Sequence, residues 1–302
     1  MADDEGNQVT RKPGDQLPPD HRITRLPGHP IGVFDSGIGG LTVVRALRAR
    51  MPNENIIYLG DTARVPYGTK SAEAITRFAL EDAAFLVRRE VKLIVVACHS
   101  ASSVALPELG RKLNVPVVGV VEPGARALVA ATETNRVAVI GTAATIRSAA
   151  YEKTIRALRP NIEILAKATP LFVPLADEGW VGAEPADGSQ RPEVVEMICR
   201  DYLGGLADEG IDALLLGCTH FPLLSGAIGR ILGPGVRLVD SSEETAAAAA
   251  KLLEKKALLN TESGAQMRIY LTDLAPNFET TGARFLGMPV GEVVRVSLGN
   301  SK

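Results

Sequence analysis

The sequence predicts an α/β protein with two related lobes, in which mainly parallel sheets are covered by helices and a functional site occupies the cleft between the lobes. Three observations lead to this prediction. Short apolar runs alternate with helical segments from residue 31 onward, as is typical of parallel sheets with helices on both faces. Two segments in the first half of the chain each have a counterpart in the second half with the same order of strand, small residues and polar residues. Polar and reactive residues directly follow the apolar runs, at the strand ends where such sheets bind ligands.

The N-terminal segment differs in composition from the rest of the chain. Residues 1–29 are polar and rich in proline, which predicts a disordered tail. His21 and His29 lie within this tail, and we interpret both as solvated. The segment has no apolar stretch of the kind found in secretory signals, so we expect a cytoplasmic protein.

In the first half of the chain, apolar runs predict strands and a 3.6-residue spacing of apolar side chains predicts helices. Ser71 is suited to cap the second of these helices. The expected strands are 31–34, 55–59, 93–97 and 116–121, and the expected helices are 41–50 and 71–89.

The second half repeats this alternation. One of its strands ends at Gly141-Thr142, and another runs into Gly217-Cys218. The expected strands are 136–140, 162–166, 213–216 and 236–239, and the expected helices are 148–158, 192–209 and 243–256.

A weak internal duplication relates the two halves. LIVVACHSAS, which starts at Leu93, and ALLLGCTHFP, which starts at Ala213, share the order of apolar strand, small residue, cysteine and polar residues. VFDSGIGGLTVV and VIGTAATIRSAA share the order of strand, small and hydroxyl residues, and helix. If the two lobes face each other, the thiols of Cys98 and Cys218 flank a single cleft.

Composition excludes several classes of function. The 302 residues carry a formal net charge of −2, with 46% hydrophobic and 23% charged residues, so we expect no nucleic-acid partner. No apolar run approaches the roughly 20 residues of a membrane span, so we expect no membrane partner. Three cysteines are too few for a disulfide framework, and no Cys/His cluster has the spacing of a zinc site.

Two thiols that face one cleft suit the inversion of an amino-acid α-carbon. One group must remove the α-proton from one face while the other returns a proton to the opposite face. A thiol has an ordinary pKa of about 8.5 and can hold either form when its surroundings lower that value. We therefore predict Cys98 and Cys218 as an acid–base pair that needs no cofactor. Cys199 lies in a helical pattern and is interpreted as a core thiol.

Each thiol needs a neighbour that handles protons. His220 lies two residues after Cys218 and has an ordinary pKa near neutrality. Asp35 ends the first strand and is the candidate partner of Cys98. Backbone N–H groups at helix N-termini can hold the carboxylates of an amino acid, and the hydroxyls that can contact it are those of Ser36, Thr142, Thr145 and Thr219.

These residues also have structural interpretations. A cysteine at a strand end is often a small core residue, and His220 can be structural. DSGIGG can be taken for a phosphate loop, but Thr42 stands where a dinucleotide fingerprint requires its third glycine. Tyr67-Gly68, after Pro66, can form a plain turn.

Taken together, the motifs resemble the glutamate racemases of the cofactor-independent aspartate/glutamate racemase superfamily. The resemblance spans about residues 31–287. It implies an isomerase that converts L-glutamate to D-glutamate for peptidoglycan, with a small-molecule substrate, no cofactor and a homodimeric state. The motifs, in order, are IGVFDSGIGGLTVV, YLGDTARVPYG, VVACHSASS, GVVEPG, VIGTAATIRSAAY, LLLGCTHFPLL, VDSSEETA and NFETTGARFLG.

The resemblance also implies roles for individual residues. Catalytic thiols at Cys98 and Cys218 are assisted by Asp35 and His220. The chain crosses between the lobes near Val121–Pro123 and near Asp240, which gives a first lobe of residues 30–122 and 240–302 and a second lobe of residues 123–239. The implied substrate contacts are Asp35, Ser36, Pro66, Tyr67, Gly68, His99, Ser100, Thr142, Thr145, Thr219 and His220.

Two departures from the family leave alternatives open. The family usually has Cys-Asn-Thr where this chain has Cys98-His99-Ser100, and an imidazole does not reproduce the amide of asparagine. The family tends to have glutamate at the place of Asp177, and Glu178 is adjacent. The alternatives are a two-thiol racemase with another amino-acid substrate and a catalytically weak binding or regulatory homologue.

Overall fold

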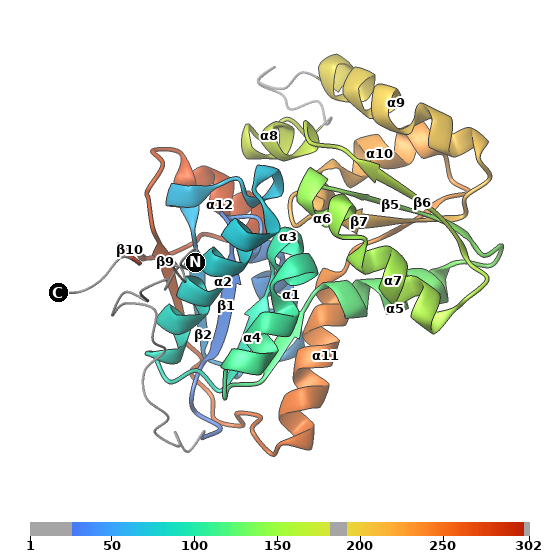
Figure 1. Cartoon of the computed structure of the whole chain (residues 1–302). Helices are drawn as coiled ribbons and strands as arrows, with labels where there is room; N and C mark the ends of the chain where they lie inside the picture. The colour runs from blue at the N-terminus through green and yellow to red at the C-terminus, as the bar shows by residue number, and fades with distance from the viewer. Residues whose placement is uncertain (1–25, 182–191, 299–302) are drawn as a thin grey trace, which may run out of the picture.

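The computed structural model of the chain describes residues 26–181 and 192–298, whose strands form two sheets (Figure 1). The first sheet has the order β10-β9-β2-β1-β3-β4. The second has the order β6-β5-β7-β8. All strand pairs in the described residues are parallel, which confirms the predicted fold class. The strands are β1 (Ile31–Asp35), β2 (Ile56–Gly60), β3 (Leu93–Val96), β4 (Val117–Gly119), β5 (Arg136–Gly141), β6 (Glu163–Ala168), β7 (Ala213–Gly217), β8 (Arg237–Val239), β9 (Met267–Leu271) and β10 (Val293–Arg295).

Helices cover both faces of each sheet. Those around the first sheet are α1 (Leu41–Arg50), α2 (Ala72–Val87), α3 (His99–Val104), α4 (Leu106–Lys112), α11 (Ser242–Lys255) and α12 (Phe278–Leu286). Those around the second are α5 (Val121–Ala131), α6 (Ala143–Ser148), α7 (Ala150–Leu158), α8 (Phe172–Asp177), α9 (Pro192–Asp208) and α10 (Ser225–Leu232). Single turns of 3₁₀ helix occur at η1 (Thr62–Arg64), η2 (Tyr67–Thr69) and η3 (Phe221–Leu224).

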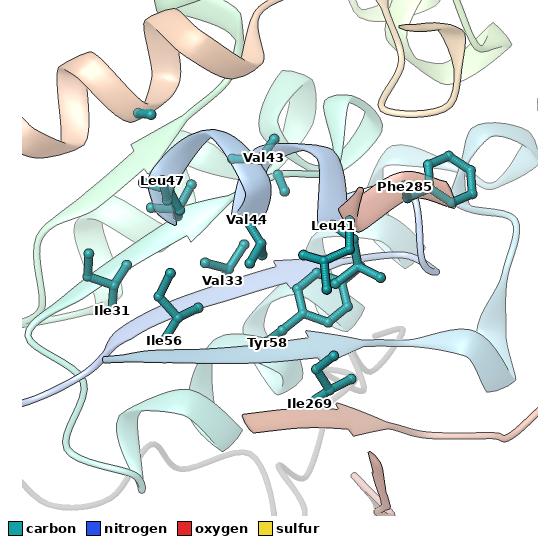
Figure 2. Packing of buried hydrophobic residues seen from close by; sticks show 14 of the residues in the cluster. Ile31, Val33, Leu41, Val43, Val44, Leu47, Ile56, Tyr58, Ile269 and Phe285 are labelled. Carbon is teal, nitrogen blue, oxygen red and sulfur yellow. The ribbon is translucent and has the colours of Figure 1, made fainter. Parts of the chain in front are cut away.

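Strand β1 shows why the strands are runs of consecutive apolar residues. Ile31 and Val33 belong to the core shared with α1, whereas Phe34 belongs to the core on the opposite face of the sheet. In Figure 2, Val33 lies between the strand and the α1 side chains Val44 and Leu41. Because successive side chains of a strand point to opposite faces, a strand covered on both faces needs apolar residues at every position.

The start of helix α2 agrees with the prediction from its sequence. The Oγ of Ser71 accepts a hydrogen bond from the Ala74 backbone N–H at 3.2 Å, which satisfies one of the free N–H groups of the first helical turn. Ile75 and Phe85 of this helix are buried.

The helix expected at 148–158 is different in the structure, because α6 ends at Ser148 and α7 begins at Ala150. Ala149, between them, has φ = 51° in the left-handed region, which costs roughly 1–2 kcal/mol for a residue other than glycine. The Oγ of Ser148 donates to the Thr145 carbonyl at 2.6 Å and accepts from the Ala150 N–H at 3.1 Å. The side chain of Ser148 therefore replaces helix hydrogen bonds at the break, and alanine gives no sequence signal for it.

The end of the predicted tail is also different. Residues 1–25, including His21, lie outside the described residues, but 26–29 form a turn in which the His29 N–H donates to the Leu26 carbonyl at 3.0 Å. His29 is half-buried rather than solvated. The reason is that the residues just before β2 and β3 bind this segment. Asn55 Nδ2 donates to the Gly28 carbonyl at 3.1 Å, and Lys92 Nζ donates to the Pro27 carbonyl.

The chain passes twice between the sheets. Strands of the first sheet lie within 31–119 and 267–295, and strands of the second within 136–239. We propose lobe boundaries near residues 122 and 240 on this basis. Across both described segments, no helix is long and apolar enough to traverse a bilayer.

Candidate active site

Cys98 lies two residues after the end of β3 and caps the N-terminus of α3. Its Sγ accepts a hydrogen bond from the Ala101 backbone N–H at 3.4 Å, and the side chain is buried. Burial and the negative charge of Asp35 raise the pKa of the Cys98 thiol to about 12, against smaller opposing effects of hydrogen bonds from Ala101 and Ser36. Near neutral pH this sulfur therefore carries a proton that it can donate.

Asp35 ends β1, which is the neighbour of β3 in the sheet, so its carboxylate lies at the same edge as Cys98. Its Oδ2 accepts the Gly37 N–H at 3.0 Å. A Cβ at Gly40 would lie 2.6 Å from the Cβ of Asp35, so glycine is required for α1 to begin this close to the strand end. Burial raises the pKa of Asp35, although the positive charge of His220 acts in the opposite direction.

Cys218 follows β7 in the second sheet and has an imidazole beside it. The Sγ of Cys218 lies 3.7 Å from His220 Nδ1, and His220 Nε2 lies 3.1 Å from Asp177 Oδ1. Burial lowers the pKa of His220, but the hydrogen bonds and charges of Asp177 and Cys218 outweigh burial and raise it well above its usual value. A protonated imidazole between a carboxylate and a sulfur can exchange a proton with that sulfur.

Hydroxyl groups from both lobes meet beside the thiols. Ser100 Oγ, in α3, lies 2.9 Å from Thr142 Oγ1, which follows β5 of the second sheet. Thr142 also caps α6, because its Oγ1 accepts the Thr145 N–H at 3.2 Å. Ser100, Thr142 and Thr145 are all buried, so the structure brings these three predicted contact residues together.

Two glycines allow the lobes to approach closely. A Cβ at Gly39, in the first lobe, would collide with the Thr219 hydroxyl and come within 2.6 Å of the His220 ring. A Cβ at Gly68 would lie 2.6 Å from the Cβ of Thr142. The loops that carry the predicted site residues of the two lobes are thus in direct contact.

Tyr67 is buried, and its phenol hydroxyl is hydrogen-bonded to carboxylates. Its Oη is within hydrogen-bond distance of Asp61 Oδ2 and lies 2.9 Å from Asp82 Oδ2. Pro66, before it, is exposed. Any contact of this turn with a substrate would therefore use the backbone of residues 66–68 rather than the phenol.

His99 forms a contact that its sequence context did not predict. Its Nε2 lies 3.1 Å from the Oγ of Ser241, at the start of α11. Burial, together with the positive charge of His220, lowers the pKa of His99 to about 3. The imidazole is therefore neutral near physiological pH, and its role as a substrate contact stays a prediction.

Several neighbours of the site were missed or left open by sequence reasoning. Asp177 contacts His220, whereas Glu178 is exposed. Asp61 directly follows β2, so the strand-end rule that selected Asp35 could have selected it too. Asp82 and Ser241 carried no signal, because one lies inside a helix and the other is a common residue at a helix start.

The described part of the chain contains no group of three or more His, Cys, Asp or Glu side chains that could hold a metal ion. The polar atoms of the site are those of thiols, hydroxyls, two separate imidazoles and carboxylates. This set fits proton transfer and the binding of a small polar molecule.

Comparisons with known proteins identify the family of this chain. Residues 41–249 match the family described as Asp/Glu/Hydantoin racemase. A glutamate racemase of Geobacter metallireducens is 49% identical over 278 residues, which cover 92% of this chain and 100% of the relative. A glutamate racemase of Syntrophus aciditrophicus is 47% identical over 271 residues, which cover 89% of this chain and 97% of the relative.

Solved structures of glutamate racemases are similar to this chain in fold as well. The crystal structure of glutamate racemase from Francisella tularensis in complex with D-glutamate matches with a TM-score of 0.83 and 40% identity, covering 91% of this chain and 99% of that one. The glutamate racemase from Thermus thermophilus, in complex with beta-chloro-D-alanine, matches with a TM-score of 0.79 and 47% identity, again covering 91% and 99%.

Proposed function

The chain belongs to the Asp/Glu/hydantoin racemase family, and from this membership we propose that it interconverts L- and D-glutamate with Cys98 and Cys218 as two opposed acid–base groups. It is an amino-acid racemase, and therefore an isomerase. The observation that carries the mechanism is that each thiol lies at a strand end of its own sheet with its own proton-handling neighbour. Asp35 serves Cys98, and His220 serves Cys218.

In one direction, the Cys218 thiolate removes the α-proton of the substrate. An S–H bond forms, the C–H bond breaks, and its electron pair stays on the α-carbon. The Cys98 thiol then donates its proton to the opposite face, which forms the new C–H bond and leaves a thiolate. In the other direction the two cysteines exchange roles. Before the same direction repeats, Cys218 must lose its new proton and Cys98 must regain one, and His220 and Asp35 are proposed to pass these two protons to and from solvent.

Electrostatic stabilisation must accompany this proton transfer, because the α-proton of an amino acid is only weakly acidic. The hydroxyls of Ser100, Thr142 and Thr145 and the backbone of residues 66–68 are proposed to hold the substrate carboxylates and amino group. Ser36 and Thr219 complete this set beside the two thiols. Fixed orientation of the α-carbon between two sulfurs supplies much of the rate.

Incubation with L-glutamate in D₂O tests this function. We expect D-glutamate to form with deuterium at its α-carbon, because the proton that is returned comes from a solvent-exchanged thiol. A folded protein that neither inverts glutamate nor exchanges its α-proton would contradict the proposal.

A racemase with another amino-acid substrate is the second candidate, and the observation that favours it is His99 in place of the family's usual asparagine. A panel of L-amino acids distinguishes the two, since a higher kcat/KM for any other amino acid than for glutamate would favour it. We further propose a cytoplasmic homodimer that supplies D-glutamate for peptidoglycan, as the family resemblance implies. Light scattering after size-exclusion chromatography measures the oligomeric state.

Replacing His99 with asparagine is expected to keep kcat/KM for glutamate within about threefold and to lower the free energy of unfolding by about 1 kcal/mol, the typical net value of one hydrogen bond. The shorter asparagine side chain loses the hydrogen bond to the Ser241 hydroxyl but restores the amide that the family usually has. Racemisation assays and urea unfolding measure the two effects. A loss of activity without a loss of stability would show that the imidazole has a chemical role.

Replacing Asp177 with asparagine is expected to lower kcat/KM about tenfold, since a hydrogen bond to a charged group contributes about 1.5–3 kcal/mol. Asp177 raises the pKa of His220, so the variant loses the His220 proton at a lower pH. The alkaline limb of the pH profile of kcat/KM should therefore move to lower pH. Glu178→Gln is the matched control, because Glu178 is adjacent but exposed. An unchanged profile in Asp177→Asn would rule out this role.

A further inference from the structure

We propose that Asp61 and Asp82 share one proton through the phenol of Tyr67, and that this buried acid pair positions the turn of residues 66–68. Asp82 acts through Tyr67 and is a positioning residue. The positioning role rests on the proposed function of the turn in substrate binding, whereas the shared proton does not.

The contacts around Tyr67 form a closed network. The side chains of Asp61 and Asp82 have no exposed surface. Arg64 binds both carboxylates, with Nε 2.6 Å from Asp61 Oδ2 and Nη2 3.2 Å from Asp82 Oδ1. Thr272, at the end of β9, donates to Asp61 Oδ1 at 3.0 Å. Tyr67 Oη is within hydrogen-bond distance of Oδ2 of both aspartates.

Counting protons shows that this network is incomplete if both aspartates are ionised. The phenol has one hydrogen and can donate it to only one carboxylate. Its second contact would then place two oxygen atoms together without a hydrogen between them. A proton on Asp82 Oδ2 resolves this, because Asp82 then donates to Tyr67 Oη, and Tyr67 donates to the Asp61 carboxylate, which Arg64 and Thr272 also bind.

The local charges lead to the same assignment. Arg64 is the cation that contacts the two buried carboxylates, and it also binds Glu81, whose side chain is 40% exposed. The nearby pair of Arg295 with Asp273, 3.3 Å apart and largely exposed, adds no net charge. Two adjacent buried carboxylates with one counter-ion cannot both ionise without a large electrostatic cost.

Burial and the mutual charge of the pair raise the pKa of Asp82 well above its ordinary value, and burial raises that of Asp61. The pKa of Tyr67 is also raised, first by burial and then by Asp82 and Asp61, so the phenol keeps its hydrogen. These directions agree with one proton on the aspartate pair and one on the phenol.

The pair is connected to the site through two residues of one turn. Tyr67 is fixed at its far end by Asp61 and Asp82, and Gly68, the next residue, packs against Thr142 of the second lobe. A rotation of Tyr67 would therefore displace the backbone that faces Thr142. Asp82 holds this turn from the middle of α2.

The first test compares the stability of the protein with that of Asp82→Asn as a function of pH. Asparagine mimics a protonated aspartate and cannot ionise. Because the folded-state pKa of the pair is raised, its stabilising contribution is complete below the ordinary value of 3.8 and is lost as pH rises through the raised value. We expect the unfolding equilibrium constant of the unsubstituted protein, divided by that of Asp82→Asn, to increase with pH. The increase should be at most about tenfold per pH unit. A ratio that decreases with pH would overturn the shared proton.

Infrared spectroscopy provides a direct signature that a merely structural role would not give. At neutral pH the carbonyl stretch of one protonated carboxylic acid should disappear in Asp82→Asn and persist in Glu81→Gln, the matched control from the same helix. An identical spectrum for all three proteins would contradict a proton on the pair.

Activity tests the positioning role separately. Asp82→Asn should retain kcat/KM within about threefold, whereas Asp82→Leu and Tyr67→Phe should raise KM for glutamate about tenfold or more, as expected when about 1.4 kcal/mol of binding is lost. Unchanged KM in Tyr67→Phe would overturn the positioning role, even if Asp82→Leu fails to fold. If the protein does not act on glutamate but the infrared and stability results are as expected, the proposed function fails and the shared proton stands.

Discussion

Replacing Cys98 with serine is expected to abolish glutamate racemisation while leaving α-proton exchange with one enantiomer. Serine keeps the size of the side chain but is a far weaker acid–base group, and a positioned acid–base group contributes about 10²–10⁴-fold to a rate. Cys218 remains and can still remove and return a proton on the face that it contacts. In D₂O this variant should label one enantiomer of glutamate without inverting it.

Cys218→Ser should show the opposite selectivity, with exchange of the other enantiomer only. NMR of the α-proton, combined with chiral chromatography, separates exchange from inversion. Cys199→Ala is the matched control, since Cys199 is a third buried thiol and lies on the face of α9 that packs into the core of the second lobe. It should racemise both enantiomers. Exchange of the same enantiomer by both serine variants would show that the thiols do not act on opposite faces.

Replacing Lys92 with methionine is expected to lower the free energy of unfolding by about 3–5 kcal/mol, the usual cost of leaving one member of a buried ion pair alone. The side chains of Lys92 and Glu54 are 0% and 1% exposed, and Nζ lies 2.6 Å from Oε2 of Glu54. Lys92 also donates to the Leu258 carbonyl at 2.8 Å. Chemical denaturation measures the effect.

Two further variants control for this interpretation. Lys92→Met combined with Glu54→Gln should recover part of the loss, because no buried charge remains and the glutamine oxygen can still accept the Asn260 N–H that Glu54 accepts at 2.8 Å. Lys251→Met, on the exposed face of α11, should change stability by less than about 0.5 kcal/mol. A Lys92→Met loss as small as that of Lys251→Met would show that water reaches Glu54.

The alternation of strands and helices from β1 to β8 could be predicted because most of these elements carry a strong local pattern, whereas β9 and β10 are not among the expected strands. Residues 31–34 and 213–217 are apolar at every position, since both faces of their sheets are covered. The position of each thiol at a strand end could be predicted because the cysteine follows such an apolar run. The helix break at Ala149 could not, because it depends on hydrogen bonds of the Ser148 side chain.

Partners that come from distant parts of the chain could not be predicted either. Nothing near Tyr67 in the sequence indicates Asp82, which lies on the buried side of a helix. The contact of His99 with Ser241 joins residues 142 positions apart. These contacts depend on how the helices pack around the sheet, and a single sequence does not encode such packing in a local pattern.

The two glycine contacts between the lobes have a consequence for the chemical lifetime of the enzyme. With Gly39 against Thr219 and Gly68 against Thr142, Cys98 and Cys218 are only 4% and 6% exposed. Alkylating agents and peroxide can therefore reach these sulfurs only when local opening of the structure exposes them. The rate of thiol modification therefore measures how often the structure around the two cysteines opens.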